Sequence, residues 1–164
     1  RSPRSKCFDV SAKSGCRGGA LSDAYVTARP QASRMHPNEI TSETIGAAMR
    51  VRTALGPGLL ESAYRACLSR ELELRGLKYQ TEVALPISYL GITVDAGYRI
   101  DLIVEDIVIV ETKAVAVLAP VHESQLLSYP RLSHRTVGLL INFHVLHLRD
   151  GIKRIVNNYK GPAI

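Results

Sequence analysis

The chain has 164 residues, enough for one domain whose core needs neither disulfides nor a structural metal. No apolar run approaches the ~18 residues that a membrane span needs, so we expect a soluble protein. The net charge of +6 is concentrated in residues 1–34, which carry seven basic and two acidic side chains, whereas the remainder carries 14 and 13. The basic pI therefore gives no argument for nucleic-acid binding, and such a function must come from a site.

Residues 1–34 lack sustained periodicity and are rich in Ser, Gly, Ala and Arg, which predicts a disordered extension. We favour Met35 as the native start, with the upstream residues as non-native translated sequence and residues 35–164 as the folded domain. An organelle transit peptide is a weaker alternative, because the segment is rich in Arg and Ser and poor in acids. The cysteines have neither zinc-site nor disulfide spacing, which favours a reducing, cytoplasmic setting.

Two helices are predicted first. Apolar residues recur every three or four positions from Asn38 to Leu55, and again from about Leu59 to Arg75. Gly56-Pro57-Gly58 separates the two segments, and Gly76 is placed to cap the second helix.

The apolar period then changes to two, which is typical of strands. Three strands, a helix and a buried strand are expected in this order: Tyr79–Leu90, Ala96–Val104, Ile107–Ala114, about Val121–Leu132, and Thr136–Val145. Leu146–Tyr159 favours a hairpin around Asp150-Gly151, although a terminal helix is nearly as plausible. The sequence thus predicts an α/β fold, with an antiparallel meander and a crossover strand in one mixed central sheet flanked by helices.

Charged side chains are rare in sheet interiors, yet Asp101, Glu111 and Lys113 fall in the second and third predicted strands. Because side chains alternate between faces, Glu111 and Lys113 share one face. The turn between the strands decides whether Asp101 joins them. A two-residue loop at Glu105-Asp106 puts Glu111 on the wrong side, whereas an odd loop or a bulge puts it opposite Asp101, with the Cβ atoms ~5 Å apart.

Two adjacent, half-buried carboxylates repel each other unless a cation lies between them. Mg²⁺ suits this position because it binds one or two carboxylates and keeps waters and substrate phosphate in its shell. Lys113 would lie beside the ion, where it can orient or activate a water. The pattern predicts metal-assisted attack on a phosphodiester, although the residues alone leave a simple salt bridge between strand-end charges open.

Further motifs strengthen this interpretation through a family resemblance. GLLESAY, at residues 58–64, precedes YRIDLIV, IVIVETKAV, PVHESQLLSY, VGLLINF and LRDGIKRIV in that order. Over about residues 38–157 the chain closely resembles the GxxExxY proteins, a small bacterial family within the PD-(D/E)XK nuclease superfamily. The resemblance implies a restriction-endonuclease-like core, which agrees with the order of elements predicted above.

The resemblance also implies roles for individual residues. Asp101 and Glu111 would be catalytic metal ligands for Mg²⁺ or Mn²⁺, and Lys113 would be the catalytic lysine. Glu61 corresponds to a helix glutamate that often helps to hold the metal. Gln125 and Tyr129 match a Q-x-x-x-Y element that assists at the active site and the nucleic-acid backbone.

Each supporting residue has a plainer interpretation. Glu61 could pair with Arg65 one helical turn away, and Tyr129 could simply pack against the core. Tyr64 lies on the apolar stripe of its helix, so packing is favoured over chemistry.

Two residues depart from the family pattern. Pro130 should end or kink the helix at Tyr129, which puts the role of Tyr129 in doubt and spares that of Gln125. Thr112 replaces an aliphatic residue, and its side chain is expected on the opposite face of the strand, away from the site.

The residues therefore favour a metal-dependent nuclease that hydrolyses nucleic acid, with DNA as the expected substrate. The alternative is a catalytically silent module that binds nucleic acid or protein on the same fold, and a weaker one is a structural protein whose charges are only ion pairs. Because the body of the chain is nearly neutral, a homodimer or a partner protein is expected to supply part of the affinity for nucleic acid.

Overall fold

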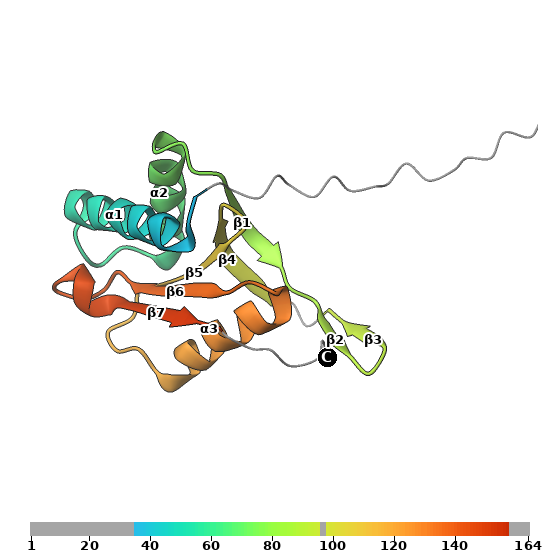
Figure 1. Cartoon of the computed structure of the whole chain (residues 1–164). Coiled ribbons are helices and arrows are strands. Elements are labelled where there is room, and N and C mark those ends of the chain that lie inside the picture. Colours follow the sequence, from blue (N-terminus) through green and yellow to red (C-terminus); the bar gives the residue numbers. More distant parts are fainter. Residues whose placement is uncertain (1–34, 96–97, 158–164) are drawn as a thin grey trace, which may run out of the picture.

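The computed structural model describes residues 35–95 and 98–157. The predictions for residues 1–34, for the start of the second strand at 96–97 and for positions beyond 157 lie outside this range. The elements, in chain order, are α1 (Pro37–Leu55), α2 (Glu61–Leu74), β1 (Tyr79–Ala84), β2 (Ile87–Tyr89), β3 (Ile92–Val94), β4 (Arg99–Val104), β5 (Val108–Lys113), α3 (Pro120–Ser133), β6 (Val137–Asn142), the 3₁₀ segment η1 (Leu148–Gly151) and β7 (Ile152–Val156) (Figure 1).

The central sheet has five strands in the order β1-β4-β5-β6-β7. All neighbours are antiparallel except β5 and β6, which run parallel because α3 carries the chain back between them. The predicted α/β fold with an antiparallel meander and a crossover strand is therefore confirmed. The hairpin expected around Asp150-Gly151 is wrong, because these residues belong to η1 and the following strand, β7, pairs antiparallel with β6.

Helices cover both faces of the sheet (Figure 1). On one face, α1 and α2 pack on Leu102, Val110 and Leu139 in a large apolar cluster. On the other face, Leu126 and Tyr129 of α3 pack with residues of β4, β5 and β6 in a smaller cluster. Among the described residues, no helix combines the length and apolar character needed to cross a membrane.

The connection from α1 to α2 is held by a tyrosine. His36 and Glu39 form a capping box at the start of α1, and Gly56 ends the helix with a φ of 72°. The ring of Tyr64 on α2 is fully buried and stacks on Phe143 with centroids 4.5 Å apart, while its hydroxyl donates to the Gly56 carbonyl at 2.6 Å. The prediction that Tyr64 serves packing is confirmed, and this packing fixes the start of α2.

One predicted strand has the wrong boundaries. The single strand expected over Tyr79–Leu90 is divided near Pro86 into β1 and β2, and β2 pairs with β3 in a separate hairpin that projects from the main sheet (Figure 1). The predicted end of the third helix, about Leu132, agrees with the observed end of α3 at Ser133, so Pro130 does not end the helix at Tyr129. Pro130 lies in the last turn and is buried, so little of the helix is lost with its missing donor.

Candidate active site

The turn between β4 and β5 sets the register of the two strands that carry Asp101 and Glu111. Three residues, 105–107, connect the strands, and Glu105 and Asp106 adopt φ values of 51° and 59°. In the resulting register, Leu102 and Val110 form the last regular pair, and beyond it the Asp101 carboxylate accepts from the Thr112 backbone N–H. The sequence left this register open between an even and an odd loop, and the structure has the odd one.

Asp101 is held by three donors. Its Oδ2 atom accepts from the Thr112 backbone N–H at 2.8 Å and from the Thr112 hydroxyl at 2.6 Å, and its Oδ1 atom accepts from Arg65 at 3.1 Å. The regular β4–β5 pairing ends at Leu102 and Val110, so the carboxylate takes over the hydrogen bonding of the next β5 amide. The prediction that the Thr112 side chain stays away from the site is wrong, because its hydroxyl can reach the neighbouring strand where the pairing stops.

Glu111 is the least satisfied charged group of the site. One carboxylate oxygen accepts from the Lys113 ammonium at 2.6 Å, whereas Oε2 is buried and has no hydrogen-bond partner. Burial, followed by the charge of Asp101, raises the pKa of Glu111 from 4.5 to about 7, although Lys113 opposes the shift. A buried carboxylate with a free oxygen favours a ligand that carries positive charge.

Lys113 is held between two acids. Burial lowers the pKa of its ammonium, but the hydrogen bond and charge of Glu111, with the charges of Glu61 and Asp101, outweigh burial and raise it. The ammonium lies 3.7 Å from Glu61 Oε1 as well as 2.6 Å from Glu111. Lys113 is therefore protonated at neutral pH, and it can donate hydrogen bonds and stabilise negative charge.

Glu61 lies at the first position of α2, and its side chain is about one-third exposed. Glu61 does not form the ion pair with Arg65 that was the alternative interpretation. Arg65 instead donates to Asp101 and to Glu82, and Glu61 faces Lys113. Glu61 thus joins the site through the lysine.

Gln125 and Tyr129 approach the site from α3. The Gln125 amide donates to the Tyr129 hydroxyl, and the Tyr129 side chain is almost fully buried in the cluster beneath α3. Burial, followed by the negative charge of Glu111, raises the pKa of the Tyr129 hydroxyl. The packing that is the plainer interpretation of Tyr129 is present.

The carboxylates of the site are suited to a divalent ion. Asp101 and Glu111 provide hard oxygen ligands, and the unpartnered Oε2 of Glu111 is the atom that a cation would satisfy. In the described part of the chain, no three His, Cys, Asp or Glu side chains form a ready-made cluster, so a third protein ligand is not pre-arranged. Two carboxylates are sufficient for Mg²⁺, which keeps several waters, and the residues fit such an ion.

A mixed α/β sheet that groups Asp101, Glu111 and Lys113 points to a nuclease-type domain. The family comparison makes the assignment: residues 38–155 match the PD-(D/E)XK nuclease superfamily, and the chain belongs to it. No curated protein and no solved structure gives a match.

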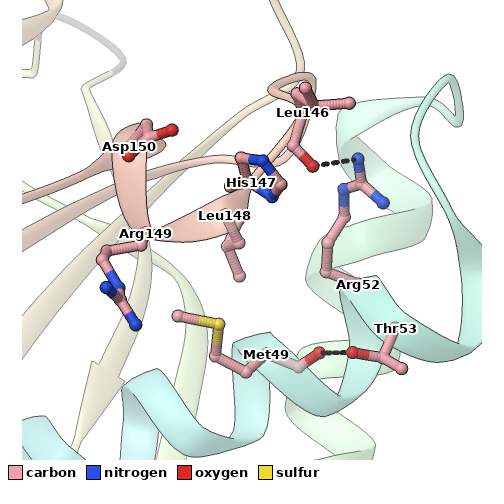
Figure 2. Close-up of a pocket in the computed structure, with 8 residues that line it drawn as sticks. All are labelled: Met49, Arg52, Thr53, Leu146, His147, Leu148, Arg149 and Asp150. Carbon is pink, nitrogen blue, oxygen red and sulfur yellow. Dashed lines mark hydrogen bonds between the residues drawn. The ribbon is translucent and has the colours of Figure 1, made fainter.

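A pocket of about 470 Å³ lies apart from these residues, between α1 and the segment around η1 (Figure 2). It is lined by Met49, Arg52, Thr53, Leu146, His147, Leu148, Arg149 and Asp150. Its Arg52 guanidinium donates to the carbonyls of Phe143 and Val145 at 3.0 and 2.6 Å. Because this cation is already bound to the backbone, we assign it to joining α1 to the chain after β6.

Sequence reasoning missed Arg65, which contacts Asp101, and Glu82, which contacts Arg65. Arg65 was considered only as a partner of Glu61, and Glu82 was not considered. Their spacing from Asp101, 36 and 19 residues along the chain, gives no local signal. Only the packing of α2 beside β1 and β4 brings the three side chains together.

Proposed function

We propose that this protein is a divalent-metal-dependent nuclease of the GxxExxY type, which hydrolyses phosphodiester bonds in nucleic acid, with DNA as its substrate. The observation that carries the proposal is the buried, unpartnered Oε2 of Glu111 beside Asp101, with a lysine hydrogen-bonded to the other oxygen. A buried carboxylate oxygen without a hydrogen bond lowers the stability of the folded state, so folding alone does not explain its presence. Membership in the nuclease superfamily supports the same reaction class.

Asp101 and Glu111 would hold Mg²⁺ or Mn²⁺, and Glu61 would support them from the start of α2. The bound ion supplies Lewis-acid stabilisation of the phosphate and helps to generate the nucleophile from water. In the hydrolysis, a water oxygen forms a bond to phosphorus and gives up a proton to solvent, the bond from phosphorus to one ester oxygen breaks, and that oxygen takes up a proton from solvent.

The chain's own side chains set the geometry of this reaction. The two Thr112 donors fix Oδ2 of Asp101, so that this carboxylate is already oriented when substrate arrives. Lys113 is protonated, so it orients the attacking water and stabilises negative charge by donating hydrogen bonds; it is not the base. Gln125 would contact the nucleic-acid backbone, with Tyr129 holding its amide.

Ion binding gives the first test, because a ligand that binds only the folded state raises the melting temperature. Mg²⁺ or Mn²⁺ should raise the melting temperature of the wild type but not that of Asp101→Ala. Asp106→Ala is the matched control, because Asp106 lies in the turn between β4 and β5 and pairs with Arg135 away from the site. At ion concentrations about 100 times the dissociation constant the stabilisation is about 2.7 kcal/mol, which is several degrees for a domain of this size.

Cleavage gives the second test and separates a nuclease from a silent module. Wild-type protein with Mg²⁺ or Mn²⁺ should be screened against duplex, single-stranded and branched DNA and against RNA. Cleavage that requires the ion and is lost in Asp101→Ala supports the proposal. Ion stabilisation without cleavage of any substrate would instead favour a module that only binds. The nearly neutral body of the chain leads us to expect that a second copy or a partner protein contributes phosphate contacts.

A further inference from the structure

Arg65 bridges a site carboxylate and a second acid outside the site. One guanidinium nitrogen lies 3.1 Å from Asp101 Oδ1, and another lies 3.1 Å from Glu82 Oε1. The three side chains differ in exposure: Asp101 is 12% exposed, Arg65 is 22% exposed and Glu82 is 53% exposed. The guanidinium thus connects the inside of the site to its rim.

The backbone at Glu82 is distorted where it lies across from Asp101. Glu82 has a φ of 51° in the middle of β1, a conformation that side chains other than glycine adopt at a cost in energy. The pairs on either side, Thr81 with Leu102 and Val83 with Ile100, are regular, whereas Glu82 and Asp101 are not paired. Strain of this kind persists where the surroundings require it, often at functional sites.

The distortion also affects β4. In a regular strand, residues three apart point to opposite faces. Ile100 and Ile103 nevertheless belong to the same apolar cluster, the one on the α3 side. Both strands therefore depart from regular geometry around Asp101, and the departure places the Glu82 carboxylate within reach of the same guanidinium.

The charges of this bridge suggest its role. Asp101 and Glu111 raise each other's energy when both are ionised, and a nearby cation relieves the repulsion. Arg65 supplies that cation to Asp101, as Lys113 does to Glu111. When a divalent ion binds to the same carboxylates, the guanidinium becomes a like charge beside it, and Glu82 offers the guanidinium a second partner.

We propose that Arg65 is a built-in counter-ion of Asp101 that shifts toward Glu82 when a divalent ion binds, so that Arg65 and Glu82 act as positioning residues that set the affinity for the ion. This inference rests on the proposed metal-dependent function. It adds that the ion and the guanidinium compete for Asp101.

The test measures ion affinity from melting temperature as a function of Mn²⁺ or Mg²⁺ concentration. Arg65→Gln should melt at a lower temperature than the wild type in a chelator but bind the ion about tenfold more tightly, since a hydrogen bond to a charged group no longer has to be broken. Arg70→Gln is the matched control: Arg70 lies on the same helix, is exposed and pairs with Glu73, so ion affinity should be unchanged.

Glu82→Gln gives a second variant at an exposed position, where folding is not at risk. Without the second partner, Arg65 remains on Asp101, and ion affinity should fall several-fold. Removing a negative charge near the site would also lower ion affinity, whether or not Glu82 acts through Arg65. The double variant Arg65→Gln with Glu82→Gln separates these two explanations. If Glu82 acts through Arg65, Glu82→Gln has no further effect once Arg65 is replaced.

The outcomes are distinguishable. Ion affinity in Arg65→Gln that is equal to or weaker than in the wild type overturns the competition and leaves Arg65 only as a support for Asp101. Should Arg65→Gln fail to fold, an unchanged affinity in Glu82→Gln overturns it instead. A wild type that shows no response to either ion overturns the metal site of the proposed function, and the competition with it.

Discussion

Replacing Glu111 by glutamine should make the ion-free protein more stable above neutral pH. The amide has the shape of the protonated carboxyl group but cannot ionise. The pKa of Glu111 is raised to about 7 in the folded protein from a reference value of 4.5, so the folded state binds its proton more tightly than the unfolded state does. The stabilising contribution of this proton is complete below pH 4.5 and is lost as the pH rises to about 7.

The magnitude follows from the size of the shift. Each pKa unit corresponds to about 1.4 kcal/mol, so ionisation of Glu111 costs the folded wild type roughly 3 kcal/mol by pH 8. Glu111→Gln escapes this loss and should be more stable than the wild type by up to that amount at pH 8, with the two proteins nearly equal near pH 4.5.

Chemical denaturation in a chelator at several pH values measures the difference. If Glu111→Gln is as stable as the wild type or less stable at pH 8, the Glu111 carboxylate is not strained, and the main argument for a cation at this position fails. Added Mg²⁺ should reverse the order, because only the wild type retains the ligand.

Two further substitutions test the supports of the site. Thr112→Val keeps the shape of the side chain but removes the hydroxyl that lies 2.6 Å from Asp101 Oδ2, so the free energy of unfolding should fall by about 1–2 kcal/mol in urea denaturation, and an unchanged value would mean that the hydroxyl contributes nothing. Tyr64→Phe removes the 2.6 Å bond to Gly56 and should cost about 1 kcal/mol by the same measurement. Its turnover of nucleic acid should remain that of the wild type, and a large loss of turnover would assign Tyr64 to the chemistry.

The sequence predicted the helices and the main strands well because their apolar periods are long and regular. The first helix was predicted as Asn38–Leu55 and is observed as Pro37–Leu55. The small hairpin of β2 and β3 was missed, since each strand has only three residues and much of its apolar surface faces solvent. A burial pattern cannot indicate a strand that buries so little.

The site was predicted by residue type but not by register. Asp101, Glu111 and Lys113 were selected as one group, yet the position of Asp101 relative to the other two depended on whether Ile107 belonged to the strand or to the turn. Ile107 was assigned to the strand, and the structure places it in the turn, where its N–H donates to the Val104 carbonyl. Moving one residue from the strand to the turn shifts the register by one. This shift changes the face of the neighbouring strand that lies opposite Asp101.

The contacts of Arg65 could not be predicted from sequence at all. An arginine one turn after Glu61 suggests a local helix pair, which is a common and weak interaction. Its observed partners come from β1 and β4, so they depend on how α2 packs beside these strands. Local patterns carry no information on such a choice.

The most direct test of the central claim compares cleavage of labelled nucleic acid by Lys113→Met and by the wild type. The melting temperatures of the two proteins should first be shown to be equal. The wild type should cut in Mg²⁺ or Mn²⁺ and stop in a chelator, whereas the variant should bind the ion and turn over at least about 100-fold more slowly. Equal cleavage by the two proteins, or no cleavage by an ion-bound wild type on any DNA or RNA, would contradict the account.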